Sequence, residues 1–209
     1  IKAAGRAMAE TDVRYYLNGL CVESNGRETI IIGTDGHRMH ILTTENNEAE
    51  QYLHPVTFII PADKVKTIIK AKSGYKLPDI EFNYDRLTYK IKVTLPDRSV
   101  IEFQSLDGKF PDWRRLVSDT EMTPVIGHYN YEYIYDAVLA WQDSTGVKQK
   151  SLAVPVLQRG NSAAAVISSG NFTALVMPLR IDAGAMPTEF NPKLQKPLTG
   201  LPLAETTAA

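Results

Sequence analysis

The sequence is short of cysteine, of net charge and of long apolar runs, and each shortage excludes a class of protein. Its 209 residues include one cysteine, Cys21, which excludes an intramolecular disulfide and a cysteine-based zinc site. No apolar run approaches the roughly 20 residues that a membrane helix needs, and no signal peptide is visible at the start. The net charge is −1, so any nucleic-acid binding must depend on a local basic face. We therefore expect a cytoplasmic protein.

The hydrophobic pattern predicts strands and helices in a recurring order. Asn25-Gly26 is a hairpin signal between the β-rich runs 13–24 and 28–36. Residues 56–60 then read as a strand, and a helix follows with an apolar face. Three strands come next, with the alternation of half-buried antiparallel strands. Their ranges are 79–84, 89–96 and 99–106.

The same order occurs again after residue 120. A short strand ends at residues 125–126, and Asn130 caps a predicted helix over 130–141. Three strands follow, over 151–157, 162–168 and 172–181. The N-terminal segment shows this order without its first strand, so the chain has a structural repeat with little residue identity. From residue 182 onward, prolines and small residues predict an extended tail without a core of its own.

The polar turn in "GTDGHRMHIL", residues 33–42, allows three interpretations: a plain hairpin turn, a catalytic pair of His37 and Asp35, and a binding surface built on a turn. Catalysis would need a nucleophile, a base and an orienting group, and the sequence has neither a nucleophile elbow nor a Cys-His signature. The histidines show no metal-ligand spacing. We therefore expect no enzyme, no metal and no cofactor.

Two further features each have a structural and a functional interpretation. The lysines between residues 64 and 76 form either a solvated helix face or a face that contacts nucleic-acid phosphates. In "PDWRRL", residues 111–116, Trp113 either fills a gap in the core or, with the arginines, anchors a binding partner.

Four stretches resemble one family in the same order along the chain: "MAETDVRYYLNGL", "TDGHRM", "LDGKFPDWRRL" and "LVMPLRI". Together they resemble the bacterial β sliding clamp, the processivity ring of the replicative DNA polymerase. The likeness assigns 1–117 to a middle domain, 118–181 to half of a C-terminal domain and 182–209 to the tail. It implies an α+β DNA-clamp fold of repeated βαβββ units, with antiparallel sheets outside and helices on one face. It also implies a bacterial, phage or mobile-element origin.

The resemblance further implies a hydrophobic pocket for short peptides of DNA polymerase, clamp loader and repair proteins. Such peptides often carry glutamine, then leucine, then a terminal leucine or aromatic residue. The matching pocket positions are Leu17, Thr34, Gly36, His37, Arg38, Met39, Pro111, Arg115, Leu116, Leu175, Met177, Pro178 and Leu179. Helices of the family line a hole for double-stranded DNA, which is bound without sequence specificity. The cations expected to face DNA are Lys2, Arg6, Lys66, Lys70 and Lys72.

Three departures from the family pattern leave alternatives open. The family's N-terminal domain is absent, a half-domain is absent after residue 117, and the helix over 130–141 has acidic but no basic residues. The protein is then a reduced clamp that encircles DNA as a non-standard homo-oligomer, or a decoy or adaptor that binds peptides without encircling DNA, or a fragment of a longer clamp. A hydrolase using His37 and Asp35 is a remote alternative. The tail stretch "QKPLTGLPL" loosely resembles a clamp-binding peptide.

Overall fold

The computed structural model describes residues 1–45, 55–72, 81–95, 97–117, 128–146, 156–157 and 162–180. Residues 1–179 form one compact unit, which we call the first unit. The sequence-based boundary after residue 117 lies inside the first unit. The expected strand at 125–126 and the tail over 182–209 lie outside the described residues.

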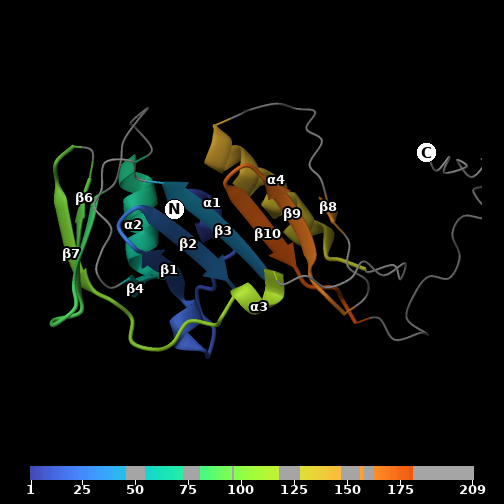
Figure 1. Cartoon of the computed structure of the whole chain (residues 1–209), viewed down its shortest axis with the longest axis horizontal. Coiled ribbons are helices and arrows are strands. Elements are labelled where there is room, and N and C mark those ends of the chain that lie inside the picture. Colours follow the sequence, from blue (N-terminus) through green and yellow to red (C-terminus); the bar gives the residue numbers. More distant parts are fainter. Residues whose placement is uncertain are drawn as a thin grey trace, which may run out of the picture. The chain divides into compact units, whose positions relative to one another are not determined.

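A seven-stranded antiparallel sheet organises the first unit, with strand order β4-β1-β2-β3-β10-β9-β8 (Figure 1). Its strands are β1 (Gly19–Ser24), β2 (Glu28–Thr34), β3 (Arg38–Glu45), β4 (Val56–Pro61), β8 (Val156–Leu157), β9 (Ala165–Ser169) and β10 (Phe172–Val176). A second, three-stranded sheet has the order β5-β6-β7. Its strands are β5 (Glu81–Asp85), β6 (Lys90–Thr94) and β7 (Val100–Gln104).

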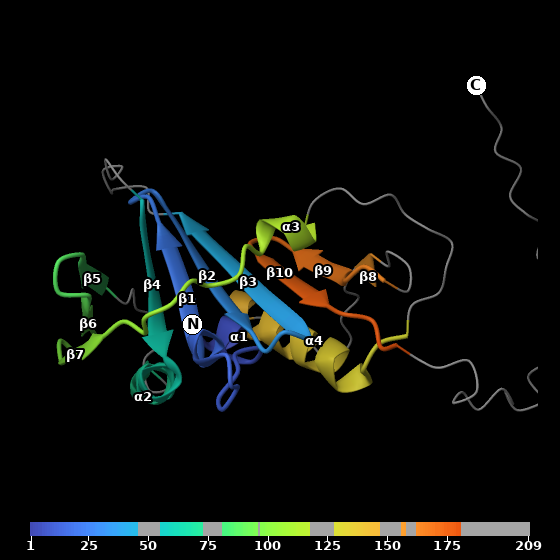
Figure 2. The same ribbon diagram turned by 90° about the horizontal axis from the view of Figure 1, so that it is seen from below.

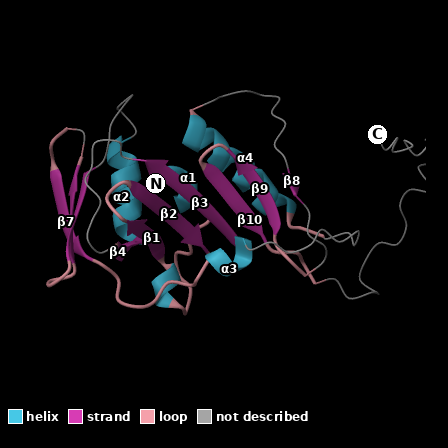
Figure 3. Cartoon of the chain, viewed as in Figure 1, coloured by secondary structure: helices cyan, strands magenta, loops and turns pink. Residues whose placement is uncertain are grey.

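Three helices cover one face of the seven-stranded sheet, and Figure 2 shows a fourth, short helix on the opposite face. The first group comprises α1 (Lys2–Gly5), α2 (Ala62–Lys72) and α4 (Tyr131–Thr145), and the short helix is α3 (Arg114–Val117). We call these two sides the helix face and the outer face. The distribution of helices and strands, which Figure 3 colours by type, confirms the predicted α+β architecture.

The first predicted repeat is confirmed by the run β4-α2-β5-β6-β7. Val65 and Ile68 of α2 are buried in a core with Leu20, Ile60 and Ile91, so that core joins the helix to both sheets. The hairpin at Asn25-Gly26 is also confirmed, since β1 pairs with β2 there.

The predicted cap of α4 is correct. Asn130 precedes the helix, and its side-chain oxygen accepts a hydrogen bond from the backbone N–H of Glu132 at 2.9 Å. The helix extends to Thr145, beyond the predicted end at 141, and Gly146 terminates it in the left-handed conformation. Ala137 and Ala140 pack with Phe172 of β10, which fixes α4 on the helix face.

The N-terminal strand was predicted to begin too early. Tyr15–Leu17 form a 3-10 turn, and β1 starts only at Gly19. The physical reason is a loop closed by Asn18. Its side-chain oxygen accepts from the backbone N–H of Asp12 at 2.7 Å, and its amide donates to the Asp12 carbonyl at 2.9 Å. The strand predicted over 172–181 likewise ends at Val176, ahead of Pro178, which has no N–H to donate.

His40 is a buried titratable group beneath α1. Its Nδ1 hydrogen-bonds with the carbonyl oxygen of Ala3 at 3.0 Å, and its ring packs edge-on against Phe172. Burial lowers the pKa of His40 to about 4, although the hydrogen bond to Ala3 opposes the shift. The imidazole is therefore neutral near pH 7.

This burial predicts a loss of stability between pH 6.5 and pH 4. The unfolded chain protonates its imidazole near 6.5, whereas the folded chain resists until about 4, so the unfolded state binds more protons in that window. The free energy of unfolding should fall by roughly 3 kcal/mol as the pH drops through it. Urea unfolding at several pH values measures the loss. A His40→Gln variant, which keeps an N–H donor for Ala3, should show a shallower dependence, and identical pH profiles for the two proteins would contradict the assignment.

Candidate functional site

Four of the predicted pocket residues pack together on the outer face of the large sheet. Leu17, Met39, Leu175 and Met177 belong to one apolar cluster, although they come from three separate parts of the chain. We call it the outer-face cluster. The other residues packed in it are Ala9, Tyr16, Cys21, Ile30, Ile32, Ile41, Ile59, Leu106, Phe110, Trp113, Ala164 and Val166.

Strand pairing brings the distant members together. In the β3–β10 ladder, Leu175 lies opposite Met39. One step beyond the ladder, the backbone N–H of Met177 donates to the His37 carbonyl oxygen at 2.8 Å. Met177 is therefore hydrogen-bonded to the turn before β3, which places it beside His37.

The turn itself is held by side-chain hydrogen bonds. Asp35 accepts from the backbone N–H groups of His37 at 2.9 Å and of Arg38 at 3.0 Å. The Thr34 hydroxyl donates to the Arg38 carbonyl at 2.7 Å and accepts from the Gly36 N–H at 3.1 Å. Gly36 has φ +87°, a conformation that L side chains rarely adopt, so glycine is required there. These bonds fix the exposed His37 at the edge of the outer-face cluster.

Arg14 is a member of this site that the sequence analysis missed. A Cβ on Gly36 would lie 2.7 Å from the Arg14 guanidinium, which also donates to the Asp35 carbonyl at 3.2 Å. Hydrogen bonds from Arg14 also lower the pKa of Asp12 to about 2, so this carboxylate stays ionised and orients the arginine. The signal was present, because Arg14 stands in the same "DVRYYLNG" stretch as Leu17.

The linker after β7 supplies one side of the site. Trp113 is half-buried in the outer-face cluster and donates from Nε1 to the Glu23 carboxylate at 3.3 Å. Leu116, on α3, is 41% exposed. Arg115 and Pro111 are also exposed, and the Arg115 guanidinium pairs with Asp112 at 3.1 Å. Trp113 therefore packs against the core, and its interpretation as a binding anchor stays a prediction.

The residues after β10 complete the rim. Met177 and Pro178 are half-buried, and Leu179 is 48% exposed. The backbone N–H of Leu179 donates to the His128 carbonyl at 2.7 Å, which holds this short segment in an extended path.

Arg38 is directed to the opposite face of the sheet. Its guanidinium pairs with Asp35 at 3.1 Å and with Asp136 of α4, and it lies over the Tyr133 ring at 4.6 Å. The side chain thus ties β3 to α4. Of the predicted pocket residues, Arg38 is the one whose charged group contacts the helix layer.

The geometry does not assemble the catalytic or metal alternatives. Asp35 accepts backbone N–H groups and pairs with Arg38, so its carboxylate is already engaged. Burial raises the pKa of the Cys21 thiol, which keeps it protonated and unreactive. Across the described ranges, no group of three or more His, Cys, Asp or Glu side chains could hold a metal ion.

Several predicted DNA-facing cations pair with acidic side chains. Lys2 lies 2.8 Å and Arg6 lies 2.6 Å from the Asp143 carboxylate of α4. Lys66 of α2 pairs with Glu10 at 2.6 Å. Burial opposes ionisation of Asp143, but the hydrogen bonds from Lys2 and Arg6 outweigh it, and the pKa of Asp143 lies below its ordinary value. Lys70 lies on α2, and the side chain of Lys72 is outside the described part.

Comparisons with known proteins show which family the chain resembles. The family model "DNA polymerase III beta subunit, central domain" matches residues 1–112. The beta sliding clamp of Haemophilus influenzae is 29% identical over 130 residues, which cover 62% of this chain and 33% of that protein. The beta sliding clamp of Pseudomonas aeruginosa is 33% identical over 111 residues, 53% of this chain and 29% of that protein. The matches thus span about a third of the relatives' length.

A solved structure extends the likeness beyond residue 112. The crystal structure of the DNA polymerase sliding clamp from Pseudomonas aeruginosa superposes with a TM-score of 0.69 at 17% identity. The superposition covers 87% of this chain and 63% of that chain. At this identity the match establishes the fold. Within the described residues, no helix is long and apolar enough to cross a membrane.

Proposed function

Because this chain belongs to the DNA polymerase III beta subunit family, we propose that it binds short apolar peptides of replication and repair proteins in the outer-face cluster. The proposed partners are DNA polymerase, clamp loader and repair proteins. The proposed action is docking without chemistry, in the cytoplasm, with no cofactor.

The observation that carries the proposal is the mixture of burial and exposure at one site. Leu17, Met39 and Leu175 are buried in the floor, whereas Leu116 and Leu179 are exposed beside it. Exposed apolar side chains next to a packed apolar floor are typical of interaction sites. Met39 and Met177 have flexible, polarizable side chains, which suit a site that accepts several peptides.

The exposed polar groups around this floor supply the directional contacts. His37 is exposed at the turn and Arg115 at the linker, so both can contact the backbone or polar side chains of a bound segment. The apolar residues of the peptide would then provide most of the affinity, and its glutamine the orientation.

Isothermal titration with the acetylated pentapeptide Gln-Leu-Ser-Leu-Phe tests this proposal. We expect saturable binding with one peptide per chain, and at least about tenfold weaker binding of the same residues in scrambled order. Equal affinity for both peptides would show that the site has no sequence preference and would overturn the proposal.

A second candidate function is an adaptor that binds such peptides without encircling DNA. The ion pairs of Lys2 and Arg6 with Asp143 favour it, because they neutralise positive charge where the family would face phosphates. The α4 helix adds Glu132 and Asp136 and has no basic residue. The alternative is a reduced clamp, in which copies of the chain bind such peptides and also form a ring that retains double-stranded DNA.

Replacing Lys66 and Lys70 together by alanine separates these two functions. A ring should lose affinity for circular double-stranded DNA, and the slope of log affinity against log salt should fall by roughly 2, one unit for each lost phosphate contact. An adaptor should show no change. Retention on nicked circular DNA, measured at several salt concentrations beside the mass in solution, distinguishes the outcomes. A matched Lys90→Ala, Lys92→Ala variant on β6 controls for the loss of two charges.

A further inference from the structure

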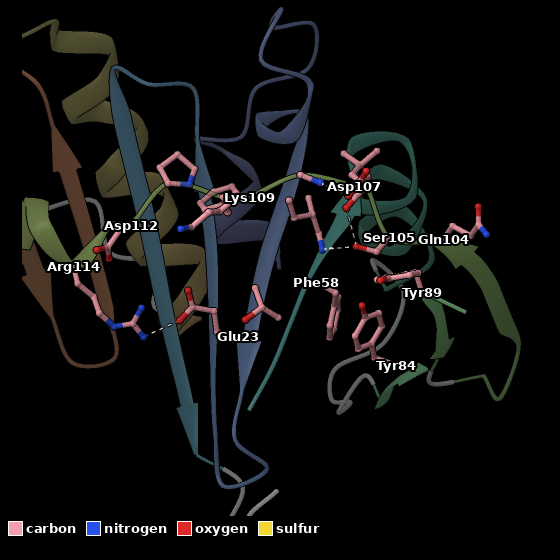
Figure 4. A pocket seen from close by; sticks show the side chains of 16 residues that line it. Glu23, Phe58, Tyr84, Tyr89, Gln104, Ser105, Asp107, Lys109, Asp112 and Arg114 are labelled. Atoms are coloured by element: carbon pink, nitrogen blue, oxygen red, sulfur yellow. Dashed lines mark hydrogen bonds and ion pairs between the residues drawn. The ribbon is translucent and has the colours of Figure 1, made fainter. Parts of the chain in front are cut away.

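A second pocket lies beside the free edge of β4, away from Leu17, Met177 and the turn. Figure 4 shows it between the edge of the large sheet, the linker after β7 and the three-stranded sheet. Its volume is about 840 Å³, within the range of ligand-binding pockets. We call it the edge pocket. The residues that decide its chemistry are Glu23, Thr57, Phe58, Tyr84, Tyr89 and Arg114.

The backbone of β4 is open at one residue inside this pocket. The outward-pointing backbone groups of Ile59 are both hydrogen-bonded. Its N–H donates to the Ser105 hydroxyl at 2.9 Å, and its carbonyl accepts from the Leu106 N–H at 3.0 Å. On the other side of Thr57, two residues before it, the Pro55 carbonyl accepts from Arg86 at 2.8 Å. Backbone groups alternate in direction along a strand, so those of Thr57 point the same way as those of Ile59.

Thr57 therefore presents one donor and one acceptor to the pocket. It is exposed, and no hydrogen bond from the described residues reaches its outward N–H or carbonyl. Because the outward backbone groups of Pro55 and Ile59 are already hydrogen-bonded, the unpaired part of the strand between them is the single residue Thr57. Such an opening matches one residue of an extended chain, which can accept from the Thr57 N–H and donate to its carbonyl.

Aromatic side chains form the wall next to this opening. The rings of Phe58 and Tyr84 stack with centroids 4.9 Å apart, and Tyr89 is 62% exposed. Tyr89 has φ 55°, a strained conformation for a bulky residue, and its carbonyl accepts from the Ser105 N–H at 2.9 Å. This bond helps to hold the strained turn against the linker. The wall suits an apolar or aromatic side chain of a ligand.

The charges of the pocket nearly cancel, because Glu23, Asp107 and Asp112 line it together with Lys109 and Arg114. Glu23 pairs with Arg114 at 2.7 Å, and Asp112 pairs with Arg115 at 3.1 Å. Asp107 and Lys109 contribute one charge of each sign at the linker. A ligand with a large net charge therefore gains little there, whereas an uncharged extended segment meets both the open backbone and the aromatic wall.

We propose that the edge pocket is a second docking site, which binds an uncharged, extended segment of a partner protein through Thr57 and an aromatic wall. One residue of that segment pairs with the backbone of Thr57, and its neighbouring apolar side chain packs against Tyr84 and Tyr89. The edge pocket shares Ile59, Leu106 and Phe110 with the outer-face cluster, but its lining does not include Met39, Met177 or His37. We therefore expect the two segments to contact different residues of the same chain.

The test uses the capped heptapeptide Thr-Val-Thr-Phe-Thr-Val-Thr, which has no charge and no glutamine. Titration followed by amide NMR should shift the Thr57 resonance and give saturable binding. Methylation of the backbone nitrogens of the two threonines that flank Phe removes the donor to Thr57 without altering the protein, and we expect affinity to fall about tenfold. Equal binding of both peptides, or an unshifted Thr57 amide at saturation, would overturn the proposal.

Protein variants provide matched controls. Thr57→Pro, which removes the outward N–H at an edge strand, should weaken binding about tenfold, while Thr57→Val should bind as the unmodified chain does. Tyr89→Ala should weaken binding about fivefold, and Tyr135→Ala, at a tyrosine that is 61% exposed on α4, should not. Met177→Asp should leave this affinity unchanged, so failure of the outer-face proposal and failure of this one can be told apart. A loss no greater for Tyr89→Ala than for Tyr135→Ala would also overturn the proposal.

Discussion

Replacing Met177 by aspartate is expected to lower the affinity for the Gln-Leu-Ser-Leu-Phe peptide by at least about a hundredfold. Met177 is half-buried beside His37 and packs in the outer-face cluster, where an apolar peptide side chain would contact it. An aspartate carboxylate there would be dehydrated when the peptide binds and would gain no hydrogen-bond or ion-pair partner. Isothermal titration of the two proteins measures the ratio.

The choice of Met177 follows from burial. Leu17 lies in the same cluster but is 1% exposed, so a charge there would destabilise the fold and lost binding could not be interpreted. Met177 follows the end of β10, and its aspartate variant should retain a cooperative unfolding transition. Val100→Asp, at an exposed residue of β7, is the matched control and should bind normally. Undiminished affinity of a folded Met177→Asp protein would show that the peptide binds elsewhere.

Replacing Phe172 by alanine is expected to lower the free energy of unfolding by about 3–5 kcal/mol. The ring is fully buried, packs with Ala137 and Ala140 of α4 and meets His40 of β3 edge-on. The substitution removes contacts that join the C-terminal strands to the N-terminal ones. Urea unfolding followed by circular dichroism measures the loss.

The two tryptophans show whether the whole first unit responds to that loss. Trp113 reports on the linker and Trp141 on α4, so Trp141→Phe and Trp113→Phe backgrounds follow each part separately. Because β10 pairs with β3 in one sheet, we expect Phe172→Ala to shift both transitions by the same amount. A shift in the Trp141 signal alone would mean that residues 1–117 and 128–179 unfold independently. Ser168→Ala on β9 controls for an ordinary surface change.

Local signals in the sequence predicted much of the fold. The Asn25-Gly26 turn, the Asn130 cap and the apolar face of α2 each depend on residues a few positions apart, and all three are confirmed. The strand start at Gly19 was predicted wrongly because β-rich composition cannot reveal the hydrogen bonds between Asn18 and Asp12. At this position the hydrogen bonds of the Asn18 side chain outweighed the local β-strand propensity.

Long-range contacts could not be predicted from local patterns. Asp136 lies 98 residues from Arg38, and Asp143 lies 137 residues from Arg6, so no periodicity links either pair. The pocket positions came instead from the family resemblance, which includes no information on how β10 would pair with β3. The edge pocket was missed because its main feature is a backbone opening at Thr57, which has no side-chain signature.

Methionine-methyl NMR tests peptide docking in the outer-face cluster most directly. Met39 and Met177 lie in that cluster, whereas Met8 is buried in the separate core on the helix face and provides an internal reference. On titration with the Gln-Leu-Ser-Leu-Phe peptide, we predict saturable shifts of the Met39 and Met177 methyl signals and an unchanged Met8 signal. Saturable binding that leaves the Met39 and Met177 signals in place would contradict the account.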